Sequence, residues 1–93
     1  GKGHAQAQLQ QYQTAIEDYS EALNVPQGLN NAHKAHTYLS KGRAFLLQGQ
    51  YQQAIEDFNV ALAIPEGLNS ELETIAYLNR EHAQAQLQQS HQD

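Results

Sequence analysis

The 93-residue chain contains no cysteine, methionine or tryptophan, and only two prolines. Without cysteine it can form no disulfide, no thiolate metal site and no cysteine nucleophile. It also has no apolar run of about 18 residues, so the sequence predicts no membrane span, and no signal peptide is visible at Gly1. We therefore expect a cytoplasmic protein with one domain.

Basic residues are scarce as well. Five Lys and Arg stand against ten Asp and Glu, which gives a formal net charge of −5. Phosphate backbones bind to basic surfaces, so we do not expect nucleic acid as a partner, and we expect no membrane partner either. The hydrophobic share of 40% is modest, but these residues recur at helical spacing, which indicates a folded chain rather than a disordered one.

A 39-residue internal repeat organises the chain. Residues 2–40 and 41–79 are identical at 18 of 39 positions when the sequence is shifted by 39, far more than chance would give. The segment HAQAQLQQ at 4–11 also recurs letter for letter at 82–89. This exact copy fits either a recent duplication or an engineered sequence.

The repeat divides the chain, which we interpret as a single repeat domain over 1–93. Residues 2–40 form a truncated first unit. Residues 41–79 form a complete second unit, whose end is the start of the next leading helix. Residues 80–89 are the remainder of a C-terminal capping helix, and 90–93 are a tail.

Apolar periodicity and turn residues predict an all-α fold with about five helices and no strand. A proline followed two residues later by glycine ends a helix at Pro26 and again at Pro65, and Gly49 marks a break. An asparagine at 30 or 31 is the expected N-cap of the third helix. Ser70 with Glu73 fits a capping box for the fifth. The expected helices cover 2–11, 12–24, 32–48, 51–63 and 70–89.

From Gly42 to Pro65 the residues follow the pattern G-x-A-F-x-x-x-G-x-Y-x-x-A-I-x-x-F-x-x-A-L-x-I-P. This pattern resembles the tetratricopeptide repeat. The resemblance implies antiparallel helix pairs stacked as a right-handed α-solenoid, and a non-enzymatic scaffold whose leading helices line a concave groove for a peptide or partner segment. Two features depart from the family. The period is 39 rather than 34, and Lys2, Lys41 and Arg80 stand where the family usually has an apolar residue.

The resemblance places one groove position at His4, Arg43 and His82, one repeat apart. Seven further residues are expected near it: His36, Leu39, Ser40, Leu46, Leu47, Leu78 and Asn79. All five basic residues lie on expected leading helices, so we predict a groove that receives an acidic or carboxylate-ended segment. The alternative is a solvated face without a ligand.

Other polar groups suggest no further site. His33 and His36 are three residues apart, but zinc needs three or four ligands, so we interpret them as surface histidines and expect neither metal nor cofactor. The pairs Glu17-Asp18 and Glu56-Asp57 are interpreted as solubilising charge on exposed helices. No catalytic motif is present, so we expect no enzymatic activity.

A second function comes from a different class, a structural repeat unit that associates with itself. About three repeats are usually needed for stability, and this chain has fewer. Incomplete units can complement each other between molecules, either as a homodimer by helix exchange or as a head-to-tail stack. Glu81 replaces the small Gly42 at the equivalent position, which opposes unlimited stacking, so a dimer is the favoured form.

Overall fold

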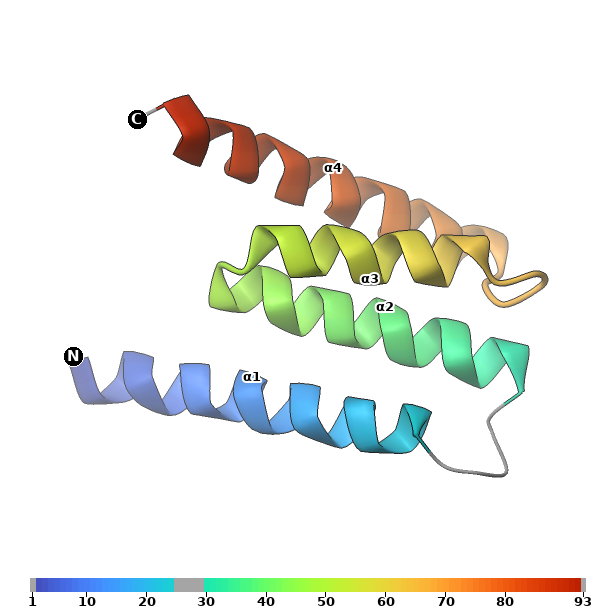
Figure 1. Ribbon diagram of the computed structural model, residues 1–93, viewed down its shortest axis with the longest axis horizontal. Helices are drawn as coiled ribbons and strands as arrows, with labels where there is room; N and C mark the ends of the chain where they lie inside the picture. The colour runs from blue at the N-terminus through green and yellow to red at the C-terminus, as the bar shows by residue number, and fades with distance from the viewer. Residues whose placement is uncertain (1, 25–29, 93) are drawn as a thin grey trace.

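A computed structural model describes the backbone of residues 2–24 and 30–92, and the side chains of 8–24 and 30–89. The described residues form four α-helices and no strand, which confirms the all-α prediction. They are α1 (Lys2–Leu23), α2 (Asn31–Gln48), α3 (Tyr51–Ala63) and α4 (Ser70–Gln92). Consecutive helices run antiparallel and lie side by side in chain order (Figure 1).

The helix count is four because α1 has no break near residue 11, where the sequence led us to expect one. The two units differ at the repeat position where the break between α2 and α3 occurs. Gly49 ends α2 in the left-handed region at φ 84°, and its N–H donates to the Leu46 carbonyl. Gln10 stands at this position in the first unit. A side chain disfavours the left-handed conformation, so the helix continues.

Asparagine caps define the starts of α2 and α4. The Asn30 side chain accepts a hydrogen bond of 2.8 Å from the His33 N–H, as the sequence predicted. Asn69 accepts an equivalent bond of 2.8 Å from Leu72. The cap of α4 is therefore Asn69, one residue before the predicted Ser70. Both asparagines follow the repeated Gly-Leu dipeptide, so the repeat fixes the cap as well as the helix.

The core lies where α3 packs between α2 and α4. Phe58 is the largest fully buried side chain, and it meets the small residue Gly42 of α2. Alanines supply most of the remaining close contacts, since they let helix backbones approach one another. The other core residues are Ala35, Leu39, Ala54, Ile55, Ala61, Leu68, Ala76 and Ala83.

Gly42→Ala should destabilise the protein by about 1–2 kcal/mol, although alanine favours helix. A Cβ added at Gly42 would lie 2.7 and 2.9 Å from two ring carbons of Phe58, and overpacking of this kind outweighs the helix-propensity gain of about 1 kcal/mol. Urea unfolding followed by circular dichroism measures the change. A variant as stable as the parent would show that Phe58 can move away from α2.

Candidate functional site

The structure separates the ten predicted groove residues into several environments. Arg43 and His82 are exposed on α2 and α4, and His36 is exposed on α2. Leu39 is only 3% exposed and belongs to the core, so it supports α2 from beneath and cannot contact a ligand. Leu46 also packs against the core. The side chain of His4 lies outside the described residues.

The C-terminal members of the set lie on α4. Leu78 is 59% exposed, while Asn79 is half-buried and donates a 2.7 Å hydrogen bond to the Ile75 carbonyl of its own helix. The next residue, Arg80, donates to Asn59 of α3 at 2.8 Å and lies over the Tyr77 ring. Of these, Leu78 offers an open apolar contact, whereas Asn79 and Arg80 are already engaged.

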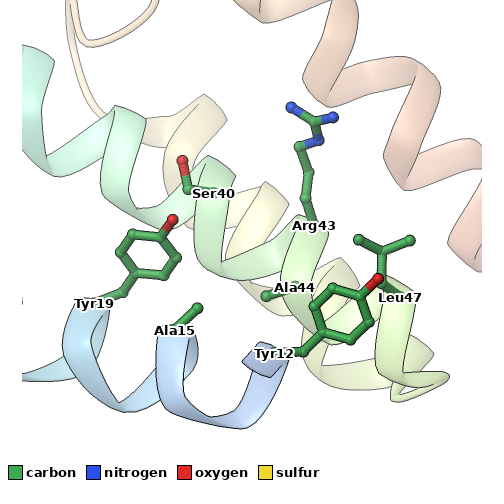
Figure 2. A pocket seen from close by; sticks show the side chains of 7 residues that line it. All are labelled: Tyr12, Ala15, Tyr19, Ser40, Arg43, Ala44 and Leu47. Carbon is green, nitrogen blue, oxygen red and sulfur yellow. The ribbon is translucent and has the colours of Figure 1, made fainter. Parts of the chain in front are cut away.

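Three predicted groove residues line a pocket of about 240 Å³ between α1 and α2. Ser40, Arg43 and Leu47 come from α2, and the α1 wall is formed by residues that the groove prediction did not include. Figure 2 shows the Tyr12 ring beside Leu47 and the Tyr19 ring beside Ser40, while the Arg43 side chain extends away from both rings. The remaining lining residues are Ala15 and Ala44.

A second pocket, of about 540 Å³, lies where the start of α2 faces the connection into α4. His36 lines it together with His33, so the two histidines face the same opening. Leu72 of α4 and Leu68 of the connection give it an apolar side. The other lining residues are Ala32, Glu66, Gly67 and Asn69.

Arg43 has no carboxylate partner within the part of the chain that the structure describes. The ion pair recorded there joins Lys41 to Asp57, with 3.8 Å between Nζ and Oδ1. Arg43 is exposed at the edge of the α1–α2 pocket. Its guanidinium extends away from the tyrosine rings (Figure 2) and presents hydrogen-bond donors that no described carboxylate uses, an arrangement that suits a carboxylate of a partner.

Asp57 corrects the prediction that the acidic pairs are exposed. Asp57 is only 8% exposed, and its Oδ2 atom has no hydrogen-bond partner. Burial raises the pKa of the Asp57 carboxyl to about 6, against the lowering effect of Lys41. Glu56 is exposed, as predicted. The two neighbours differ because Asp57 lies on the side of α3 that faces Lys41.

Sequence reasoning missed the α1 wall of the smaller pocket, and a signal for it was present. Tyr12, Ala15 and Tyr19 stand one repeat before Tyr51, Ala54 and Phe58. In the second unit Ala54 and Phe58 are completely buried. The same positions on α1 are half-buried and line a pocket, because no leading helix packs on them there.

In the described residues, no group of three or more His, Cys, Asp or Glu side chains is placed to hold a metal ion. None of the described helices combines the length and apolar character needed to cross a bilayer.

Antiparallel helices that stack in chain order and are built from a repeated sequence define an α-helical repeat protein. A family model described as tetratricopeptide repeat matches residues 1–66. The chain belongs to the tetratricopeptide repeat family, and this membership indicates a protein–protein interaction scaffold. No curated protein and no solved structure gives a significant match to the chain.

Proposed function

We propose that this protein is a non-enzymatic scaffold that binds an acidic peptide or partner segment along α2, with α4 as the second wall of the groove. The observation that supports this most is the position of Arg43. It is an exposed cation without an ion-pair partner among the described residues, and it lies at a pocket lined by two tyrosines and a leucine.

The surface around Arg43 accounts for both affinity and orientation. A carboxylate on the partner would pair with the guanidinium, which offers donors in a planar fork. An apolar side chain next to it would contact Leu47 and the Tyr12 ring. Farther along α2, the pocket with His36 and Leu72 offers a second apolar contact, so the segment would lie along the helix rather than across it.

Arg43→Ala should weaken binding of an acidic peptide about tenfold, which is the loss of one charge-assisted contact, or ~1.4 kcal/mol. Fluorescence anisotropy with a labelled Glu- and Leu-containing peptide measures the effect, and raising the salt concentration should weaken binding by the parent. Lys34→Ala is the matched control, because Lys34 is another cation of α2 that lines neither pocket. We expect it to change the affinity less than twofold.

A second peptide, identical except that Lys replaces each Glu, tests whether the surface prefers a negatively charged partner. It should bind more weakly than the acidic peptide. Equal affinity for both peptides, unchanged by Arg43→Ala, would contradict the proposed function. Light scattering on the protein alone measures self-association separately, so the alternative of a homodimer is tested without a ligand.

A further inference from the structure

The larger pocket, of about 540 Å³, combines apolar side chains with a single carboxylate. Leu68 and Leu72 line it on one side, and His33 and His36 of α2 line it on the other. Glu66 lines it from the connection between α3 and α4. With histidine counted as neutral, Glu66 is the only charged residue among the described residues of the lining, so the pocket carries negative charge at pH 7.

The connection that carries Glu66 is held against α2 on both sides of that residue. The side-chain amide of Asn31 donates a 3.1 Å hydrogen bond to the Pro65 carbonyl. Gly67 is buried, and a Cβ added there would lie only 2.5 Å from the Cβ of Ala35. A partner that pairs with Glu66 therefore binds to a backbone that is already ordered, which lowers the entropic cost of the contact.

Glu66 has two unusual properties for a residue in a short connection. Its φ is 56°, and among the described residues it is the only non-glycine residue with a positive φ, a conformation that glycine and asparagine adopt more readily. It also has no ion-pair partner among the described residues, where the recorded pair joins Lys41 to Asp57. Its carboxylate is exposed and available to a cation from outside the chain.

The pocket and Arg43 lie along one face of α2. His36 and Arg43 are seven residues apart, which is close to two helical turns, so both project from the same side of the helix. Both are exposed. The rise between them is about 10 Å, a distance that an extended segment covers in about three residues. A segment whose carboxylate pairs with Arg43 thus has a residue at the pocket about three positions away.

We propose that this pocket receives a basic side chain of the partner segment, lysine or arginine, about three residues from the carboxylate that Arg43 binds. The placement of the segment rests on the proposed function. The alkyl stem of the basic side chain contacts Leu72, and its cationic end pairs with Glu66. The neutral imidazoles of His33 and His36 offer acceptor nitrogens to the same end. The partner segment therefore carries charges of both signs at a defined spacing.

Anisotropy titrations with two labelled peptides test the proposal. Each contains one Glu, and they differ only in the residue three positions away, which is Arg in one and norleucine in the other. Norleucine keeps an unbranched alkyl stem without the charge. Both are made with the Glu before and after this residue, because the direction of the segment is set by whichever order the parent binds more tightly. In that order the Arg peptide should bind about threefold more tightly than the norleucine peptide, as expected for an exposed ion pair.

Glu66→Gln should remove this preference, by weakening the Arg peptide about threefold and leaving the norleucine peptide unchanged. Glu66→Gly should have the same effect, and since glycine adopts the positive φ readily, that loss could not be assigned to a distorted connection. Glu73→Gln is the matched control. Glu73 is another exposed carboxylate near the start of α4, and it lines neither pocket, so the preference should change by less than about 1.5-fold.

Equal affinity of the parent for the Arg and norleucine peptides in both orders would overturn the inference, and so would a preference that survives Glu66→Gln. Arg43→Ala on the same peptides reports on the proposed function separately, because it should weaken the Arg and norleucine peptides alike. A loss in Arg43→Ala without any effect of Glu66→Gln would leave the proposed function standing and reject the basic side chain at this pocket.

Discussion

Phe58→Ala should lower the free energy of unfolding by about 3–5 kcal/mol, the largest single loss that we expect in this protein. Phe58 is 0% exposed and is the largest fully buried side chain among the described residues. Its ring fills the space beside Gly42, and alanine would leave a cavity there. A chain of this size is stable by only about 5–15 kcal/mol in total, so the variant should melt more than about 12 °C lower.

Tyr19→Ala is the matched control, because Tyr19 occupies the same repeat position as Phe58. It is half-buried beside an open pocket, so the expected loss is smaller, about 1–2 kcal/mol. Urea unfolding by circular dichroism measures both. Should Phe58→Ala not fold, Phe58→Leu keeps most of the volume and should cost less than about 1.5 kcal/mol. Equal losses for Phe58→Ala and Tyr19→Ala would contradict the packing described here.

Asp57→Asn should increase stability at neutral pH by up to about 3 kcal/mol. The pKa of Asp57 rises from its ordinary value of 3.8 to about 6 in the folded protein, and one pKa unit corresponds to about 1.36 kcal/mol. The ionised carboxylate is buried with one oxygen unpartnered, and Lys41 compensates only part of its lost hydration. Asparagine has nearly the same volume and no charge to bury.

The sign of the pH dependence follows from the raised pKa. Well below the ordinary pKa of 3.8 the carboxyl is protonated in both the folded and the unfolded state, so Asp57 carries no penalty there. Between pH 3.8 and about 6 the unfolded state has released the proton while the folded state still holds it, so the parent loses stability relative to the variant across this range and no further above it. The advantage of Asp57→Asn should therefore be complete above pH 7 and absent below pH 4.

Denaturant unfolding of both proteins between pH 3.5 and pH 8 measures this difference directly. Asp18→Asn is the control, since Asp18 stands one repeat earlier and is exposed. We expect it to change stability by less than about 0.5 kcal/mol at any pH. If Asp57→Asn instead destabilises the protein at pH 7.5, the Lys41–Asp57 pair stabilises the fold by more than the burial of the carboxylate destabilises it.

The sequence by itself determined the helices of the second unit and their turn. Apolar spacing predicted α2 and α3, and Gly49 predicted the break between them, because periodicity and backbone preference act over a few residues. The sequence also contained the reason why α1 has no such break, since Gln10 stands in place of Gly49.

Burial, in contrast, was decided only by the tertiary structure. Leu39 and Leu78 occupy the same repeat position, yet the first is 3% exposed and the second 59% exposed. Likewise Asp18 is exposed while Asp57 is buried beside Lys41. Residues with the same identity and the same local conformation differ here because burial depends on which neighbouring helix covers them. Which helix that is depends on contacts between distant segments, and a repeated sequence pattern cannot distinguish one unit from the next.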